Sequence, residues 1–553
     1  MKPWDHWRGR ARYTVFDSHH GDGSRLAAVL AAWRADPERP ARLHLVAVVL
    51  PGHGLQPGFH RIPQPDAGVT LDLLAAPLDE ALAQLNAHPD YIHLHGAAGT
   101  AFARPLARLA ALDAHLCAPD LDDAQRAALA AQGFAFAANG VDAVFSSRKP
   151  RLPATPEPER RALVLGAGLA GCAAAARLCA RGWDVTLVER HPRAAMEASG
   201  NLAGIFMPLL SRDDNVPTRL TRAAYLYALR LWEQLGGVGR AFEGEQCGVL
   251  QLARDAAHAA ASRAIASGDA PPPGFARWLE PAEAAALLGL PAPDGGWLFP
   301  QGGWARPGSV CAAMLDACGA RLARRFGAGD VVLERADGEW IARGADGAEL
   351  GRAPTVVLAG GAGARRMAQT ADLPLQALRG QVTHLAPELA PRLPLVLCRE
   401  AYLTPSSDGT RCAGATYDLD DDPHLRAASQ DENLARLRAL VSDPHAGAGA
   451  PLAGRVGFRC VAPDRLPLVG RLPDFAAAGA TERLRDVPRH PGLYGLLGYA
   501  SRGLIWAPLA AELLAAQLEG EPLPLEMALV DALDPARFVL RARRASRMPP
   551  AGD

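Results

Sequence analysis

Leu163-Val164-Leu165-Gly166-Ala167-Gly168-Leu169-Ala170-Gly171 begins the stretch of sequence that decides the fold. An apolar strand leads into Gly-x-Gly-x-x-Gly, a helical run follows, and a second strand ends on Glu189, 18 residues after the third glycine. This is the dinucleotide-binding fingerprint in its required context. Gly166 permits a tight turn, Gly168 lets the backbone approach a pyrophosphate, and Gly171 lets the helix pack closely. Glu189 is expected to accept hydrogen bonds from a ribose.

A second glycine-rich helix start lies near the C-terminus. Tyr494 to Leu497 are strand-like, and the segment 498–504 leads into a helix that continues through Leu513. Backbone N–H groups and the positive end of a helix stabilise anionic charge, which a reduced flavin carries on its pyrimidine ring. The candidate cofactor residues here are Gly498, Ser501, Arg502, Gly503 and Leu504.

Two further segments are candidates for the same site. In Ala198-Ser199-Gly200-Asn201, small residues let the backbone pass a flat ring, while Ser199 and Asn201 can hydrogen-bond its polar edge. An ordinary structural loop is the alternative. The apolar strand 355–358, followed by Gly360, is expected to return the chain to the central sheet beside the first strand.

Composition limits the class of protein. The 553 residues suggest two or more domains, and no apolar run reaches the 18 residues that a membrane span needs. Nine cysteines without a C-x-x-C pair predict reduced thiols in a cytoplasmic protein. The net charge of −1 means that a nucleic-acid partner would need local arginine patches. Lys2 and Lys149 are the only lysines, so no lysine after residue 149 can serve catalysis.

The chain divides into two α/β regions. Residues 1–147 alternate strands (13–16, 43–50, 69–74, 91–94 and 134–145) with alanine-rich helices, and 148–159 is a proline-rich linker. Residues 160–553 are expected to hold a doubly wound nucleotide-binding domain (about 160–240, 301–375 and 455–535). An inserted antiparallel-sheet substrate domain is expected at about 241–300 and 376–454.

The second region resembles a known family. Residues from about 160 to 535 are similar to the D-amino-acid oxidase-type flavoproteins and, more narrowly, to the oxidase half of the bifunctional tRNA 5-methylaminomethyl-2-thiouridine biosynthesis (MnmC) family. The segments that carry the resemblance are Ala198-Ser199-Gly200-Asn201, Cys247-Gly248-Val249, Pro300-Gln301-Gly302-Gly303-Trp304, Arg379-Gly380-Gln381-Val382, Glu400-Ala401-Tyr402-Leu403-Thr404-Pro405, Gly414-Ala415-Thr416-Tyr417, Gly457-Phe458-Arg459-Cys460 and Ser501-Arg502-Gly503-Leu504.

The resemblance implies noncovalent FAD and a tRNA that carries a modified wobble uridine. It implies oxidation of the C–N bond of a 5-carboxymethylaminomethyl group, followed by hydrolysis to glyoxylate and 5-aminomethyluridine. Arginine suits the substrate carboxylate because its fork is bidentate, so Arg459 and Arg502 are the candidates, with a structural ion pair as the alternative. Tyr402 and Tyr417 are candidate positioning hydroxyls, with sheet packing as the alternative.

In the family the N-terminal region is a methyltransferase that uses S-adenosylmethionine, and the present sequence departs from its pattern. His19 replaces the first glycine of the loop that follows Asp17, and the strand 43–50 has Val49 where an acid should bind the ribose. Leu94-His95-Gly96 lacks the aspartate of a later turn. These departures predict a degenerate methyltransferase-like domain, and a fully bifunctional enzyme stays as an alternative. Two further alternatives for the function of the whole chain are an oxidase of a free small amino acid and a non-catalytic protein that binds flavin and tRNA.

The histidines of the first region are candidates for a metal site. His93 and His95 lie on one face of a predicted strand, and His19 and His20 are expected nearby. Because no fourth ligand is arranged around them, satisfied or solvent-facing histidines are favoured and no metal is predicted.

Overall fold

The computed structural model describes residues 2–50, 54–66, 68–147, 156–268, 271–405, 407–449, 452–479 and 481–547, without the side chains of 545–547. Most of the predicted linker, including Lys149, lies outside these residues. The chain forms two compact units. The first comprises Met1–Pro158 and Glu512–Asp531, and the second comprises Glu159–Ala511 and Ala532–Asp553.

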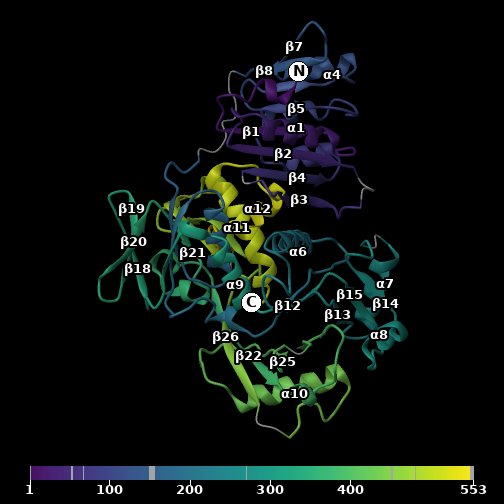
Figure 1. Ribbon diagram of the computed structural model, residues 1–553, viewed down its shortest axis with the longest axis vertical. Helices are drawn as coiled ribbons and strands as arrows, with labels where there is room; N and C mark the ends of the chain where they lie inside the picture. The colour runs from purple at the N-terminus through teal and green to yellow at the C-terminus, as the bar shows by residue number, and fades with distance from the viewer. Residues whose placement is uncertain are drawn as a thin grey trace. The chain divides into compact units, whose positions relative to one another are not determined.

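The first unit is built on one eight-stranded sheet in the order β3-β4-β2-β1-β5-β6-β8-β7 (Figure 1). Strands β1, β2, β4, β5 and β6 are parallel, whereas β3 and β8 run antiparallel to their neighbours. Its elements are β1 (Arg12–Asp17), α1 (Ser24–Ala35), β2 (Arg42–Val49), β3 (Gly58–Pro63), β4 (Val69–Ala75), α2 (Leu78–Gln84), β5 (Tyr91–His93), α3 (Ala103–Leu109), β6 (His115–Cys117), α4 (Asp123–Ala131), β7 (Phe134–Phe136) and β8 (Asp142–Phe145).

The strand order makes this sheet doubly wound. From β1 the chain adds β2 and β4 on one side and then β5 and β6 on the other, so the order reverses between β1 and β5. In such sheets ligands bind beyond the carboxyl ends of the strands at the point of reversal. The predicted Rossmann-like fold is confirmed, although the sequence reading did not identify β3 and β6.

A buried arginine anchors a late segment of the chain in the first unit. Arg61, on β3, donates to both oxygens of Asp72 at 2.8 and 2.7 Å and to Glu512 Oε1 at 2.9 Å. It also donates to the carbonyl oxygen of Pro522 at 2.6 Å. All three charged side chains are buried, so this unit is completed by residues from the C-terminal part of the flavoprotein-like region.

The second unit contains a six-stranded sheet in the order β17-β10-β9-β21-β28-β27. The first five strands are parallel and β27 is antiparallel. Its elements are β9 (Arg161–Leu165), α5 (Leu169–Cys179), β10 (Asp184–Val188), α9 (Pro307–Asp316), β17 (Leu322–Arg325), β21 (Thr355–Leu358), β27 (Leu468–Pro473), β28 (Arg489–Leu497) and α11 (Gly503–Glu519), of which the last crosses into the first unit. As expected, β21 returns to lie beside β9.

An eight-stranded second sheet carries the inserted segments, in the order β14-β15-β13-β23-β24-β25-β22-β26. Its strands are β13 (Val249–Leu252), β14 (Arg277–Leu279), β15 (Gly296–Phe299), β22 (Gln376–Leu385), β23 (Val396–Cys398), β24 (Tyr402–Leu403), β25 (Arg411–Gly414) and β26 (Ala453–Val461). All of its pairs are antiparallel except β13 with β23. Helix α10 (Ala427–Val441) packs on β22, β24 and β25 (Figure 1).

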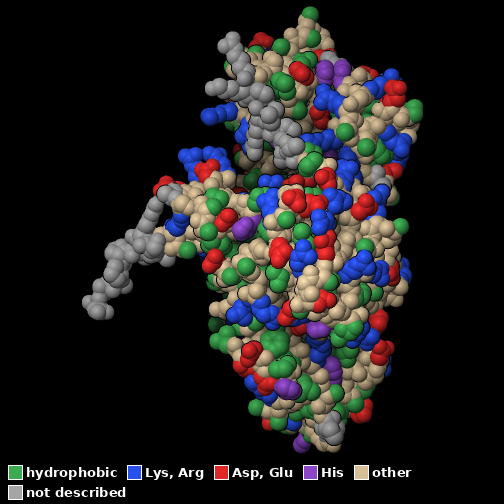
Figure 2. All heavy atoms as spheres, turned by 90° about the vertical axis from the view of Figure 1, so that its left-hand side faces the viewer, with side chains coloured by type: hydrophobic (Ala, Val, Ile, Leu, Met, Phe, Trp, Pro, Cys, Tyr) green, Lys and Arg blue, Asp and Glu red, His purple; other side chains and the backbone are tan. Residues whose placement is uncertain are grey.

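No helix in the described part of the chain is long and apolar enough to cross a membrane. On the face seen in Figure 2, arginine and acidic side chains are interspersed, without a broad field of one sign.

Candidate active site

The glycines of the fingerprint form a turn that only glycine can build. Gly166 has φ +104°, and a Cβ there would lie 2.8 Å from the carbonyl oxygen of Ala359 and from Gly360 Cα. A Cβ on Gly171 would lie 1.7 Å from the carbonyl oxygen of Gly166. The close approach of β9, the loop after β21 and the start of α5 therefore requires Gly166 and Gly171, and it places Gly360 directly beside the turn.

Glu189 and Ser199 hold the ends of this turn. Glu189 is buried and accepts hydrogen bonds from the backbone N–H groups of Ala167 at 2.6 Å and His191 at 3.0 Å. Ser199 Oγ accepts the N–H of Leu169 at 3.1 Å, so it caps helix α5. The sequence analysis expected Ser199 at the edge of a flat ring, whereas its hydroxyl lies at the helix start that would face a pyrophosphate.

Arg455, on β26, fastens the loop that contains Gly200 and Asn201. Its guanidinium donates to the carbonyl oxygens of Met196 and Glu197, both at 2.6 Å, and to Asn201 Oδ1 at 3.3 Å. A Cβ on Gly200 would lie 2.4 Å from Arg455 Nη2. The sequence analysis did not select Arg455, because nothing in the local sequence connects it with a loop more than 250 positions away.

The second glycine-rich helix start also forms as expected. Gly498 and Ala500 have φ +74° and +50°, which turns the chain sharply between β28 and α11. Ser501 is exposed and Leu504 is buried against the core. A Cβ on Gly503 would lie 3.2 Å from Leu169 Cδ1, so the amino ends of α11 and α5 are neighbours.

These residues fit FAD. The turn at 166–171 leaves backbone N–H groups and a helix amino end for the pyrophosphate, and the adjacent amino end of α11 offers a second positive region. The residues that the sequence predicts would hold it are Gly166, Gly168, Gly171, Glu189, Ser199, Gly200, Asn201, Gly360, Gly498, Ser501, Arg502, Gly503 and Leu504.

The catalytic candidates come together beside α11. The Arg459 guanidinium lies over the ring of Tyr417, with Cζ 4.3 Å from the ring centroid, and Nη1 donates to the carbonyl oxygen of Thr416 at 3.2 Å. On its other side the guanidinium lies against Gly380, where a Cβ would be 2.1 Å from Nη1. Gly380 therefore provides the space in which Arg459 lies flat.

Tyr402 and Arg502 belong to the same cluster. Burial raises the pKa of Tyr402, and the nearby Arg459 charge opposes that rise. Burial lowers the pKa of Arg502, and the neighbouring Cys398 and Tyr417 oppose that change. Arg502 Nη1 donates to the carbonyl oxygen of Met207 at 3.3 Å. Four residues selected from the sequence thus come from β24, β26, the loop after β25 and the start of α11.

Neither arginine forms an ion pair with a carboxylate in the described part of the chain. Each donates one hydrogen bond to a backbone carbonyl, although a guanidinium carries five N–H donors. The alternative of a structural ion pair is therefore not observed among these residues. Two cationic forks with spare donors beside a candidate flavin site can bind the carboxylate of a substrate.

The loop that follows β1 in the first unit is occupied by its own side chains. Asp17 is buried and accepts hydrogen bonds from Arg25 Nε at 2.8 Å and Nη2 at 3.2 Å and from the His19 N–H at 3.0 Å. Burial favours the protonated acid, but hydrogen bonds from His93 and Arg25 outweigh it and lower the pKa of Asp17. Nearby, His95 pairs with Asp120 at the ends of β5 and β6.

These residues do not fit S-adenosylmethionine. The point where the strand order reverses holds the Arg25 cation on Asp17 and the rings of His19, His93 and His95. Strand β2 ends on the apolar Val49, so no carboxylate is available there for a ribose. In the described part of the chain, no three His, Cys, Asp or Glu side chains gather as a metal site either.

Solved structures share the fold of the second unit. Iminodiacetate oxidase from Chelativorans sp. BNC1 is 28% identical, with a TM-score of 0.53 over 66% of this chain and 96% of that one. Glycine oxidase from Geobacillus kaustophilus is 22% identical, with a TM-score of 0.56 over 68% and 99% of the two chains, which supports the fold alone.

Sequence comparison extends over both units. Residues 161–517 match the model of the FAD dependent oxidoreductase family. The tRNA 5-methylaminomethyl-2-thiouridine biosynthesis bifunctional protein MnmC of Azoarcus sp. (strain BH72) is 42% identical over 98% of this chain and 92% of its own. The protein of the same name in Burkholderia cenocepacia (strain HI2424) is 42% identical over 99% and 92%. The chain therefore belongs to the MnmC family and carries its FAD dependent oxidoreductase domain.

Proposed function

We propose that this protein is an FAD-dependent oxidoreductase that acts on the 5-carboxymethylaminomethyl group of a wobble uridine in cytoplasmic tRNA. The observation that carries the proposal is the pair of arginines, Arg459 and Arg502, which lie beside the candidate flavin site and pair with no carboxylate among the described residues. A substrate in which the carbon of the reacting C–N bond carries a carboxylate would pair with these two guanidinium groups.

Bound FAD would supply the two-electron acceptor. The secondary amine of the substrate loses two electrons and two protons and becomes an imine. Hydrolysis of the imine then releases glyoxylate and leaves 5-aminomethyluridine. Arg459 and Arg502 would bind the carboxylate and fix the methylene carbon in place. Tyr402 and Tyr417 would line the space around the substrate amine. Because no lysine follows residue 149, no lysine ammonium of the second unit can compete for the carboxylate.

An oxidase of a free small amino acid is the first alternative. Such an enzyme would enclose its substrate, whereas Tyr417 is 57% exposed and sits at the edge of the catalytic cluster. Because this edge of the catalytic cluster is exposed, a substrate whose reacting group is part of a larger molecule is favoured over a free amino acid. A non-catalytic flavin-binding protein is disfavoured for another reason, because it would not need two arginines that pair with no described carboxylate beside the candidate flavin site.

A fully bifunctional enzyme is the remaining alternative. The occupied loop after β1 and the apolar end of β2 support the proposal that the first unit does not bind S-adenosylmethionine. We therefore propose a division into a degenerate methyltransferase-like domain at 1–147, a linker at 148–159 and an oxidoreductase at 160–553, of which the segment Glu512–Asp531 belongs to the first compact unit. The oxidoreductase would release a primary amine, which a separate methyl-transfer reaction would consume.

Nucleoside analysis of tRNA from a strain that lacks the gene tests the proposal. We expect 5-carboxymethylaminomethyluridine or its 2-thio form to accumulate, and wild-type protein to reverse this. Complementation with the Arg502→Gln variant should fail. Unchanged tRNA in the deletion strain would contradict the proposed function.

A further inference from the structure

The loop between β25 and α10 (residues 415–426) exposes apolar side chains next to the catalytic cluster. Tyr417 is 57% exposed, Leu419 79% and Leu425 49%, and these are three of seven large exposed apolar residues in the described chain. Leu425 turns back toward β26, where a Cβ on Gly454 would lie 3.2 Å from its Cδ2. Tyr417 and Leu419 are left as the outward-facing pair.

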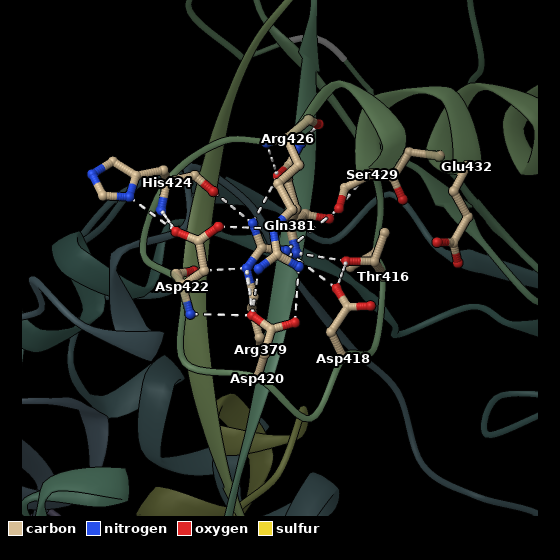
Figure 3. Close-up of polar contacts among 12 residues, drawn as sticks. Arg379, Gln381, Thr416, Asp418, Asp420, Asp422, His424, Arg426, Ser429 and Glu432 are labelled. Carbon is tan, nitrogen blue, oxygen red and sulfur yellow. Dashed lines mark hydrogen bonds and ion pairs between the residues drawn. The ribbon is translucent and has the colours of Figure 1, made fainter.

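This loop is held in place from beneath. Arg379, on β22, is fully buried and donates to the carbonyl oxygens of Asp422 at 2.7 Å and His424 at 2.6 Å (Figure 3). It also donates to Asp418 Oδ2 at 3.2 Å, and its backbone pairs with that of Asp418 in both directions. A buried guanidinium that fixes the loop backbone lowers the entropy cost of using the loop as a binding surface.

The charges of the loop are partly compensated within it. Arg426 binds both oxygens of Asp420 at 2.8 and 2.7 Å and donates to Asp422 Oδ2 at 2.8 Å (Figure 3). Together with Arg379 it pairs with three of the four aspartates, Asp418, Asp420 and Asp422. Two arginines and four aspartates leave a net charge of −2 on these residues. Apolar side chains on a loop of net negative charge suit contact with nucleobases and not with phosphates.

One face of the Tyr417 ring is already covered by the Arg459 guanidinium. Because more than half of the side chain is exposed, the opposite face remains accessible for stacking. The same guanidinium is a candidate for binding the substrate carboxylate. A base stacked on the open face of Tyr417 would therefore be separated from that guanidinium by the Tyr417 ring, close to the nucleotide being oxidised.

We propose that Tyr417 and Leu419 form a stacking platform for the unpaired nucleobases that flank the target uridine in the anticodon loop. This inference rests on the proposed function, since it assumes a tRNA substrate. Proteins recognise single-stranded RNA loops by splaying out bases and stacking them on aromatic side chains. Such stacking is tolerant of sequence, so one platform can serve several tRNAs.

The test compares binding of an RNA stem-loop with turnover of the free nucleoside. Holoenzyme variants Tyr417→Ser, Tyr417→Phe and Leu419→Ser are titrated with a labelled anticodon stem-loop that contains the modified uridine. The control Val332→Ser removes an equally exposed apolar side chain from β18 (Val331–Ala336), outside this loop. Each variant is also assayed with free 5-carboxymethylaminomethyluridine, and its oligomeric state is measured.

The platform predicts that Tyr417→Ser weakens stem-loop binding about 5- to 140-fold, equivalent to ~1–3 kcal/mol. Leu419→Ser should weaken it less, Tyr417→Phe should bind within about twofold of wild type because stacking survives, and Val332→Ser should match wild type. The losses with stem-loop should exceed those with free nucleoside.

Wild-type affinity in both serine variants would overturn the platform, as would equal losses with stem-loop and nucleoside. If these variants lose a dimer that the wild type forms, the surface binds a second copy of the chain, and the platform proposal is overturned as well. If wild-type enzyme oxidises neither the nucleoside nor the tRNA, the proposed function itself fails, which is a different result from these.

Discussion

The Arg459 guanidinium is held between the ring of Tyr417 and the backbone of Gly380, with its Cζ 4.3 Å from the ring centroid. A Cβ on Gly380 would lie 2.5 Å from that Cζ. The position of a candidate carboxylate-binding cation therefore depends on the absence of one methyl group on the neighbouring strand.

Gly380→Ala should displace Arg459 without requiring a left-handed backbone at residue 380. Because Arg459 would lose its place over Tyr417, we expect kcat/KM for tRNA to fall by roughly tenfold or more, as for loss of a hydrogen bond to a charged group. Gly274→Ala is the matched control, since a Cβ there meets nothing within 4 Å. Steady-state kinetics with flavin content measured in parallel would check this. Equal activity in both alanine variants would mean that Arg459 is not needed where it lies.

Arg502→Gln should impair substrate binding, and because Arg502 is also among the residues that would hold FAD, flavin content is measured in parallel. Loss of charged hydrogen bonds to a carboxylate costs about 1.5–3 kcal/mol, which corresponds to roughly 10- to 150-fold in kcat/KM. Arg502→Lys, which keeps the charge but not the fork, should recover part of this loss. The exposed Arg335→Gln serves as the control. If Arg502→Gln kept the wild-type kcat/KM, Arg502 would not bind the substrate carboxylate.

S-adenosylmethionine should not bind the protein. Asp17 is engaged by Arg25, and β2 ends on Val49 without an acid. Isothermal titration of the full-length holoenzyme should give no saturable heat, and Arg25→Ala should not restore binding because the ribose acid is still missing. Saturable one-to-one binding to wild type would instead support the bifunctional alternative.

Arg61→Met should destabilise the first unit. It removes the cation that pairs with the buried Asp72 and Glu512, a change that typically costs about 3–5 kcal/mol. Scanning calorimetry should show a lower transition temperature for that unit, whereas Arg34→Met, which breaks a surface pair with Asp66, should change it little. For the same reason, residues 1–158 alone should unfold more easily than within the full chain. A fragment of wild-type stability would show that Glu512 and Pro522 do not matter to this unit.

Local sequence was sufficient to predict the nucleotide-binding turn. Gly166, Gly168 and Gly171 lie within six residues. Gly166 and Gly171 are required by contacts made inside the same βα unit or with the adjacent strand, whereas a Cβ on Gly168 would lie 3.1 Å from Ser199 Oγ, outside that unit. The start of α11 was predictable for a similar reason, because the turn at Gly498 and the helix that follows are continuous in sequence.

Contacts between distant residues could not be predicted in this way. Arg455 meets Asn201 across 254 positions and Arg61 meets Glu512 across 451. Arg379 holds residues 415–426 from another strand. A single sequence gives the residue types but not which distant side chains the sheets bring together, so these arginines were not selected as supports of the site.

Anaerobic mixing of the holoenzyme with tRNA that carries 5-carboxymethylaminomethyluridine tests the central claim most directly. The account predicts bleaching of the oxidised flavin spectrum, with one glyoxylate and one 5-aminomethyluridine formed for each flavin reduced. Glycine and unmodified tRNA should leave the spectrum unchanged. An unchanged spectrum with the modified tRNA, or bleaching by glycine alone, would contradict it.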